Sequence, residues 1–274
     1  MLEMTGISYH YQPGKPAVDN VSLRIQAGEF VAIAGRNGSG KTTLTRLIMS
    51  LIKPASGQII LNGVNTSKQS PGDIARHVGY VFQNPDSQIF RDTVASETAY
   101  GPEQLGFTTP EIASAVAEAL EQTGLTALAD AYPRGLSRGQ KQRVTIASAL
   151  AMKPDILILD EPTSGQDAKE KENLLRILTE LNEQGKTIIL VTHDMDILAR
   201  YARRAVVMAS GAKVFDGTVA ELFAQGNDVQ KWGLREPAIM NISRKLSKVG
   251  VLPALTATEL SQQISERLQG GRMQ

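Results

Sequence analysis

The chain has 274 residues, of which 42% are hydrophobic, so it can build one large α/β domain or two small ones. Its 29 Lys and Arg residues balance 28 Asp and Glu residues, and the net charge of +1 argues against a general, sequence-independent grip on nucleic acid. The absence of cysteine excludes disulfides and thiolate metal sites and fits a reducing cytosol.

The beginning of the chain and its apolar runs bear on membrane association. The first ten residues, MLEMTGISYH, lack the basic region and apolar stretch of a secretory signal. No apolar run approaches the roughly 20 residues needed to cross a bilayer. We therefore expect any membrane role to be peripheral.

The pattern of apolar residues predicts an α/β fold. VSLRI (21–25) and GQIILNG (57–63) alternate like strands of a half-exposed antiparallel sheet near the N-terminus. Short β-branched runs at 29–35, 78–83, 156–162 and 187–193 are typical of buried parallel strands. Helical patterns such as 42–51 and 168–185 follow most of these runs. This alternation places reactive loops at the carboxyl ends of the strands.

Two further regions are predicted to be helical. Between about 84 and 154, strand-like runs give way to Ala-rich segments such as EIASAVAEALEQTG, which indicates a helical insertion in the α/β core. From 227 to 274, the weakly amphipathic stretches 236–250 and 256–269 predict a small helical extension after a main domain of residues 1–226.

GRNGSGKTT, residues 35–43, matches the phosphate-binding loop of P-loop NTPases and lies between a predicted strand and a predicted helix. In such a loop the glycines let backbone N–H groups surround a phosphate, Lys41 reaches the β- and γ-phosphate oxygens, and the Thr42 hydroxyl ligates Mg²⁺. A turn that only caps a helix would explain the glycines but not Lys41 and Thr42 at this spacing. The predicted nucleotide-binding residues here are Gly35, Asn37, Gly38, Ser39, Gly40, Lys41, Thr42 and Thr43.

Three other strand ends carry candidate catalytic residues. Asp160 and Glu161 follow ILIL, so Asp160 can hold Mg²⁺ through water and Glu161 can act as general base on an attacking water. An ordinary strand-to-loop exit is the alternative for these two acids. His193, after TIILVT, is a candidate donor to a γ-phosphate, with a structural role as the alternative. Gln83 ends the run VGYVFQ and could contact Mg²⁺ and water, so Thr42, Gln83 and Asp160 are the predicted metal ligands.

The stretch LSRGQKQR, residues 136–143, has two interpretations. Ser137 and Gln140 stand three apart before an apolar helical run, which is the pattern of a capping box. A helix N-terminus with Ser, Gly and Arg can also hold an anion, because its N–H groups and the helix dipole favour negative charge. Taken alone, the stretch favours the cap.

The order of these motifs resembles the nucleotide-binding domains of ABC ATPases over about residues 1–225. The resemblance implies that Ser137, Gly139 and Gln140 face ATP held by a second copy, so that two subunits sandwich two nucleotides. It also implies that Tyr11 stacks on adenine, with Tyr9 as the weaker candidate. A loop around Asp167, in SGQD, would then cross the dimer interface.

A closer resemblance lies in QNPDSQIF (83–90), TVASETAYGPEQLGF (93–107) and the tail from 231. These are similar to the ATPase subunits of energy-coupling factor transporters, which import vitamins and transition metals and include the cobalt and nickel types. The resemblance implies that Gln88 and Phe90 border a groove for a helix of a membrane subunit. A polar surface loop is the alternative.

The chain departs from the usual family pattern at two places. Arg138 stands where the signature usually has its first glycine, and Gly165-Gln166 replaces Gly-Leu or Ala-Leu. Both bear on the tuning of the composite site and on pairing with an identical or a paralogous subunit. We expect the Arg138 side chain to lie beside the phosphate, so that Arg138→Gly keeps activity. The competing hypothesis is an arginine finger supplied to the second subunit, whose loss would collapse turnover.

The resemblance implies an ATPase that uses ATP and Mg²⁺ at the cytoplasmic face of the membrane. Its partners would be a second ATPase subunit, as a homodimer or a paralogous heterodimer, an integral membrane coupling subunit and a substrate-binding membrane subunit, and not nucleic acid. A mechanical ABC ATPase acting on ribosomes or DNA is the alternative, although such proteins usually carry tandem domains or long coiled-coil insertions. A small-molecule P-loop kinase would have no use for LSRGQ.

Overall fold

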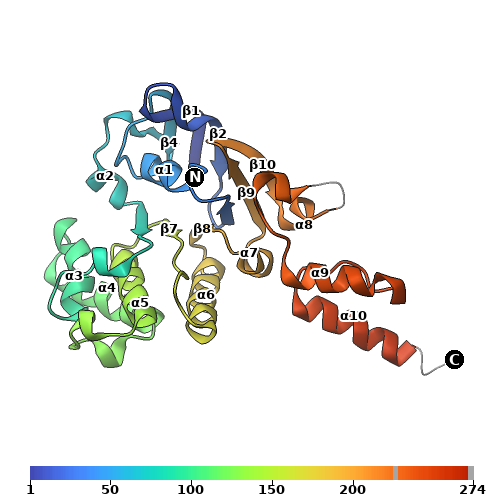
Figure 1. Ribbon diagram of the computed structural model, residues 1–274. Helices are drawn as coiled ribbons and strands as arrows, with labels where there is room; N and C mark the ends of the chain where they lie inside the picture. The colour runs from blue at the N-terminus through green and yellow to red at the C-terminus, as the bar shows by residue number, and fades with distance from the viewer. Residues whose placement is uncertain (225–227, 271–274) are drawn as a thin grey trace.

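Two β-sheets organise the computed structural model, which describes residues 1–224 and 228–270 (Figure 1). One is antiparallel, in the order β2-β1-β4-β5, and the other has the order β10-β9-β3-β8-β7-β6. In the second sheet β9, β3, β8, β7 and β6 run parallel, and β10 pairs antiparallel with β9. The strands are β1 (Leu2–Gln12), β2 (Lys15–Ile25), β3 (Phe30–Ala34), β4 (Ser56–Leu61), β5 (Val64–Asn65), β6 (Val78–Val81), β7 (Ile156–Asp160), β8 (Thr187–Thr192), β9 (Arg204–Ala209) and β10 (Ala212–Thr218).

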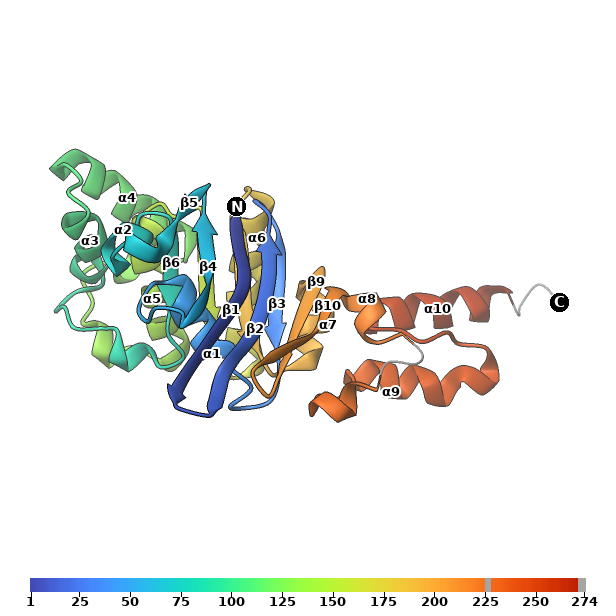
Figure 2. The same cartoon turned by 90° about the horizontal axis from the view of Figure 1, so that it is seen from above.

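Ten α-helices lie within the described residues, and two groups of them lie at opposite ends of the molecule (Figure 1). The helices are α1 (Lys41–Ile48), α2 (Pro71–Ala75), α3 (Val94–Gln104), α4 (Thr109–Gln122), α5 (Arg138–Ala151), α6 (Ala168–Glu183), α7 (Met195–Tyr201), α8 (Val219–Leu222), α9 (Ala238–Lys245) and α10 (Ala257–Gly270). Figures 1 and 2 show α3, α4 and α5 gathered on one side of the molecule, and α9 and α10 extending from the opposite side. The predicted helical insertion and helical extension are therefore both present.

The central strand β3 shows why the parallel sheet is rigid. All five of its residues are buried, and they alternate between two hydrophobic cores. Val31 and Ile33 pack in the core formed with α1 and the antiparallel sheet, whereas Ala32 and Ala34 pack in the core formed with α5, α6 and α7. Covered on both faces, the sheet holds its strand ends in fixed positions.

The predicted antiparallel strands near the N-terminus are present as β2 and β4. Both pair antiparallel with β1, which lies between them and which the sequence pattern did not reveal. The hairpin of β9 and β10 was missed as well. Its turn at Ser210 and Gly211 has φ values of 49° and 85°, and two positive values are what a tight hairpin turn requires.

Within residues 1–224 and 228–270, every helix is too short or too polar to cross a bilayer.

The C-terminal helices have a core of their own. α9 and α10 share a small apolar core of Val251, Ala254 and Leu260. The predicted boundary at 226 and 227 lies outside the described residues, as does the end of the chain at 271–274. The domain division therefore stays a prediction.

Candidate active site

The carboxyl ends of four neighbouring parallel strands meet at one edge of the sheet. The loop from Gly35 follows β3, Asp160 and Glu161 end or follow β7, His193 follows β8, and Gln83 lies just beyond β6. Parallel strands end on the same edge, so motifs up to 158 residues apart become neighbours there. The structure thus brings together the predicted catalytic and phosphate-binding residues.

The loop before α1 has the backbone geometry of an anion site. Gly40 is the N-cap of α1 with φ 105°, and a Cβ at this position would collide with the backbone oxygen of Ala17. No side chain caps this helix, and the N–H groups of Lys41, Thr42 and Thr43 precede the first helical hydrogen bond, from Leu44 N to Gly40 O. These N–H groups are therefore placed to receive an anion.

Ser39 adds a second sign that the loop can bind an anion. Its hydroxyl is buried and has no hydrogen-bond partner among the described residues. A buried unpaired hydroxyl costs about 1–3 kcal/mol. A phosphate oxygen in the loop would supply the partner that the protein itself does not.

Lys41 is held in the loop by backbone oxygens. Its Nζ donates to Gly35 O at 2.8 Å and to Arg36 O at 3.0 Å, and the side chain is buried. Burial lowers the pKa of Lys41, while the charges of Glu161 and Asp160 act in the opposite direction. An added phosphate would further favour the charged amine.

Thr42 and Asp160 form a polar pair below the loop. The Thr42 hydroxyl donates to Asp160 Oδ2 at 2.8 Å, and the Tyr80 hydroxyl donates to the same oxygen at 3.3 Å. Burial raises the pKa of Asp160, against the lowering effect of these two hydrogen bonds. Burial and the nearby Asp160 charge likewise raise the pKa of Tyr80. A buried carboxylate beside a hydroxyl is a hard-oxygen donor set that suits Mg²⁺.

Other kinds of metal site are less well supported. No group of three or more His, Cys, Asp or Glu residues is arranged to hold a metal ion in residues 1–224 and 228–270. Mg²⁺ commonly binds through one carboxylate, a hydroxyl, water and substrate phosphates. Thr42 and Asp160 fit that pattern.

Glu161 is the most constrained member of the site. Its Oε2 accepts from Gln83 Nε2 at 3.0 Å and from the Ser164 hydroxyl at 3.4 Å, and its Oε1 lies 3.2 Å from His193 Nδ1. The Glu161 backbone has φ 48°, an uncommon conformation for a residue with a side chain. Its N–H donates to Val191 O at 3.0 Å, which ties it to β8. A carboxylate held in this way can accept a proton from a water in the adjoining cavity.

Gln83 contacts Glu161 from just beyond the end of β6. Its amide nitrogen donates to Glu161, and its side chain lines the cavity together with Thr42. The structure thus brings Gln83 to the Glu161 carboxylate, while its role as a Mg²⁺ ligand stays a prediction.

A cavity of about 520 Å³ opens over the phosphate loop. Tyr11 lines it, is 56% exposed, and places its hydroxyl 3.5 Å from Thr43 Oγ1. Tyr9 packs edge-on against Tyr11, with ring centres 5.0 Å apart, and is half-buried against the core. Tyr11 is therefore the better placed of the two aromatic rings. Sequence reasoning missed Gln12, Lys15, Pro16 and Ala17, which the hairpin of β1 and β2 brings to the same cavity.

The segment from Ser137 lies apart from this cavity, since none of residues 137–140 lines it. Ser137 is exposed at the start of α5 and forms the predicted capping box: Gln140 N donates to Ser137 Oγ at 3.2 Å, and Ser137 N donates to Gln140 Oε1 at 2.9 Å. Gly139 packs tightly against Glu170 of α6, where a Cβ would collide with the carboxyl group. The capping prediction is therefore confirmed. Asp167 also caps a helix, because its carboxylate accepts from Glu170 N at 2.9 Å.

Gln88 and Phe90 border a second cavity, of about 480 Å³, between α2, α3 and α5. Gln88 is fixed to β6 and its exit, because its side chain bonds Tyr80 O and Phe82 N at 3.3 Å each. Phe90 is 52% exposed and packs edge-on against Tyr100. An exposed aromatic at the edge of a groove is consistent with a docking surface.

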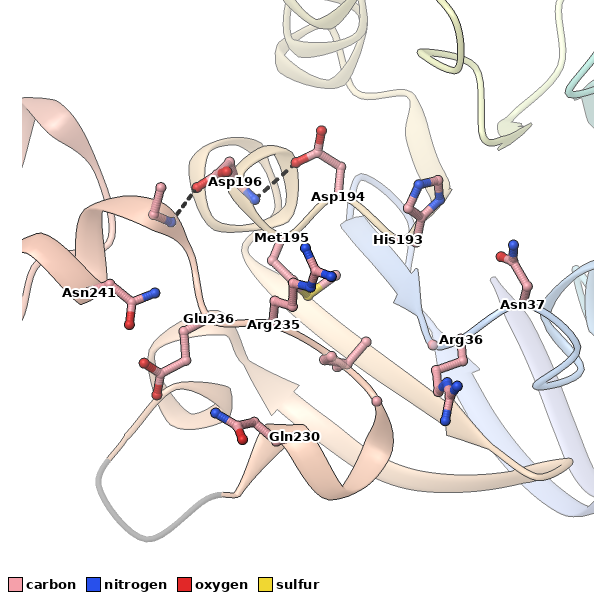
Figure 3. A pocket seen from close by; sticks show the side chains of 14 residues that line it. Arg36, Asn37, His193, Asp194, Met195, Asp196, Gln230, Arg235, Glu236 and Asn241 are labelled. Carbon is pink, nitrogen blue, oxygen red and sulfur yellow. Dashed lines mark hydrogen bonds between the residues drawn. The ribbon is translucent and has the colours of Figure 1, made fainter.

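A third cavity, of about 1190 Å³, lies between the phosphate loop, the start of α7 and the C-terminal extension (Figure 3). Figure 3 shows Arg36, Asn37 and His193 on one side of it and Gln230, Glu236 and Asn241 on the other. The C-terminal extension touches both the phosphate loop and the start of α7. Gly233 lies against the Arg36 side chain, and Ala238 N donates to Asp196 Oδ1 at 2.8 Å. Sequence reasoning did not foresee these contacts.

The family model described as ABC transporter matches residues 18–164, which span the phosphate loop, Gln83, the LSRGQ segment and Glu161. The chain belongs to the ABC transporter family. Among curated relatives, a Methanosarcina mazei protein described as an ABC transporter ATP-binding protein is 43% identical over 256 residues, which make up 93% of this chain but 43% of that protein. The chain thus spans less than half the length of this relative. The energy-coupling factor transporter ATP-binding protein EcfA of Methanothermobacter thermautotrophicus is 39% identical over 91% of this chain and 81% of its own length.

Two solved structures of ABC ATPases support the same assignment. CbiO1 of Clostridium perfringens, described as part of the ABC transporter complex CbiONQ, has a TM-score of 0.76 and 36% identity, covering 85% of this chain and 94% of that one. A dimeric ATP-binding cassette in a post-hydrolysis state, bound to ADP and phosphate, has a TM-score of 0.72 and 30% identity, covering 80% and 99%. The predicted α/β P-loop NTPase fold and the resemblance to energy-coupling factor ATPases are confirmed. The roles of the individual site residues stay predictions.

Proposed function

We propose that this chain is the ATP-hydrolysing subunit that energises an energy-coupling factor importer of a vitamin or a transition-metal ion. The observation that carries the proposal is the position of Glu161. It is held by Gln83, Ser164 and His193 at the edge of the cavity that the phosphate loop lines. A constrained carboxylate next to an anion-binding loop is the arrangement that water attack on a phosphoryl group needs.

The nucleotide would lie in the 520 Å³ cavity. Its phosphates would accept from the N–H groups at the start of α1, from the Ser39 hydroxyl and from Lys41, and its adenine would stack on Tyr11. Lys41 then exchanges part of its bonding to Gly35 O and Arg36 O for phosphate oxygens. Asn37, Gly38 and Thr43 complete the loop around these groups.

Thr42 and Asp160 would hold Mg²⁺, with Gln83 as the third predicted ligand. The ion, when bound, neutralises charge on the phosphates. The first turn of α1 carries Thr42 and the end of β7 carries Asp160, and the Thr42 hydroxyl donates to Asp160 Oδ2 at 2.8 Å.

In the hydrolytic step, the oxygen of a water forms a bond to the γ-phosphorus as the bond to the ADP oxygen breaks. Glu161 accepts the proton that the water loses. His193 donates a hydrogen bond to a γ-phosphate oxygen and orients it, and Gln83 steadies the carboxylate and the water. Each role matches the contacts around Glu161.

A second subunit would complete the site. Ser137 is exposed and lies outside the phosphate-loop cavity, so its route to a γ-phosphate is across an interface with another copy or a paralogue. Gly139 and Gln140 would approach with it. The dimeric state of the cassette bound to ADP and phosphate supports this pairing.

Membrane partners are supported by the CbiONQ description of one structural neighbour and by the groove beside Gln88 and Phe90. We infer that an integral coupling subunit docks there, that a separate membrane subunit binds the substrate, and that this chain sits peripherally at the cytoplasmic face.

Expression of the tagged chain in its native membranes tests the proposal. We expect stable co-purification with an integral membrane partner, and ATP-driven uptake after reconstitution of that complex into liposomes. Recovery with ribosomes or DNA, and no membrane partner, would contradict the importer function.

A further inference from the structure

We propose that Arg138 is a positioning residue, which ties the start of α5 to the loop that carries Glu161. This inference rests on the proposed ATPase function and adds a residue to its machinery. Arg138 follows Ser137 at the start of α5, and both residues are exposed on the surface that would face a second subunit.

The Arg138 side chain is directed to its own chain. Its Nε donates to Ser164 O at 2.9 Å, and its guanidinium lies over Gly165. Gly165 has φ 72°, and a Cβ there would lie 3.0 Å from Arg138 Cζ, closer than packing normally allows. The glycine therefore leaves the space that the arginine occupies.

Ser164 passes this contact on to Glu161. Ser164 N donates to Glu161 O at 3.2 Å, and the Ser164 hydroxyl lies 3.4 Å from Glu161 Oε2. The chain between them is a tight turn that begins with the positive φ of Glu161. Such a conformation persists only where surrounding contacts hold it. Arg138 provides one of these contacts from outside the turn.

The position of α5 does not depend on Arg138 alone. Lys141 forms an ion pair with Asp86 at 2.8 Å, and Arg143 lies 3.9 Å from Glu170 of α6. Loss of the Arg138 side chain therefore leaves the helix in place and frees the turn at Ser164. The effect is confined to the Glu161 side chain and its orientation.

This geometry differs from an arginine finger. A finger extends its guanidinium to the phosphate of another subunit, and its charge is the active feature. For a positioning role the active feature is the hydrogen bond to Ser164 O. Glutamine separates the two hypotheses, because its amide nitrogen lies the same number of bonds from the backbone as arginine Nε but carries no charge.

The test compares Arg138→Gly with Arg138→Gln in steady-state ATP hydrolysis by the assembled ATPase dimer. The contact of Arg138 with Ser164 O replaces the sequence-based expectation that Arg138→Gly keeps activity. We expect this variant to lower kcat about tenfold, the effect of losing one charge-assisted hydrogen bond, with KM for ATP changed less than about twofold. Arg138→Gln should stay within about threefold of wild type in kcat. Thermal unfolding of both variants checks that they are folded.

A double-mutant cycle with Ser164→Ala adds a measurement that a purely structural role would not satisfy. Ser164→Ala removes the hydroxyl that reaches Glu161 but keeps the carbonyl that accepts from Arg138. In that background the effect of Arg138→Gly on kcat should fall below about threefold, because the two residues act in series.

Three results would overturn the inference: an unchanged kcat in Arg138→Gly, equal damage from Gly and Gln, or a full tenfold effect in the Ser164→Ala background. Equal damage with losses of about 10³-fold would favour the arginine finger. A wild-type protein without ATPase activity would refute both the proposed function and this inference. If the wild type is active, the comparison of its Arg138 variants tests this inference alone.

Discussion

Replacing Glu161 with Gln removes the base but keeps the size of the side chain. The Glu161 side chain is 11% exposed, and Gln83 and Ser164 both donate to the same oxygen, Oε2. The amide oxygen of a glutamine can accept both hydrogen bonds, and the amide nitrogen then faces His193 Nδ1, which can accept in the other tautomer. We therefore expect a folded protein that binds ATP as the wild type does.

The expected effect on turnover follows from the lost proton acceptor. General base catalysis contributes about 10²–10⁴-fold, so kcat should fall by this factor and the activation free energy rise by about 2.7–5.4 kcal/mol. Chemistry is then slower than assembly, and the ATP-bound dimer should accumulate. Phosphate release measures kcat, a direct titration measures ATP affinity, and light scattering with and without ATP measures the dimer.

Glu172→Gln is the matched control, since Glu172 is 54% exposed on α6, pairs with Arg200, and lies outside the site. It should leave all three measurements close to wild type. An active Glu161→Gln protein with near wild-type kcat would remove Glu161 from the mechanism. A protein that stays monomeric with bound ATP would contradict the sandwich.

Three further predictions address binding, docking and stability. Lys41→Ala removes the amine from the loop and should weaken nucleotide binding by at least about tenfold; an unchanged affinity in a direct titration would contradict that role. The double change Gln88→Ala and Phe90→Ala should spare ATP hydrolysis by the isolated subunit and impair assembly or transport, and unaffected reconstituted transport would refute the docking surface. Burial acts to raise the pKa of Asp216, but hydrogen bonds from Arg204 and a neighbouring lysine outweigh it and lower that pKa below its ordinary value. Asp216 therefore stabilises the fold above about pH 4 and loses this contribution as the pH falls through its folded pKa. Asp216→Asn should therefore cost about 2 kcal/mol of unfolding free energy at pH 7 and progressively less at a pH below that folded pKa, as measured by urea titrations. An equal difference at both pH values would show that the ion pairs are not responsible.

The candidate site was largely predictable because its residues follow strands that the sequence marks clearly. β3, β6, β7 and β8 are buried throughout, so their apolar runs are short and uninterrupted. The rule that parallel strands end at one edge then brings Glu161 and His193 together without any knowledge of side-chain contacts. β7 and β8 are adjacent in the sheet, and His193 Nδ1 lies 3.2 Å from Glu161 Oε1.

The antiparallel sheet was harder to predict because its central strand has no regular alternation. The pairing of β1 with β2 is interrupted by register shifts between Met4 and Ile7 and again at Tyr9 and His10. Each irregularity moves the side chains to the other face and breaks the period of two on which recognition depends. β1 therefore escaped notice, although it joins β2 and β4.

The C-terminal extension shows a limit of another kind, because its contacts depend on surfaces that only the folded core creates. Gly233 has φ 74° and accommodates the Arg36 side chain, and Ala238 N bonds Asp196. Arg36 directly follows the first glycine of the phosphate loop, and Asp196 lies in the first turn of α7, just after His193. The extension thus contacts the segments that follow β3 and β8, two strands whose neighbourhood exists only in the folded sheet. No pattern within residues 228–270 could indicate these contacts, because the partner surface is assembled from two distant parts of the chain.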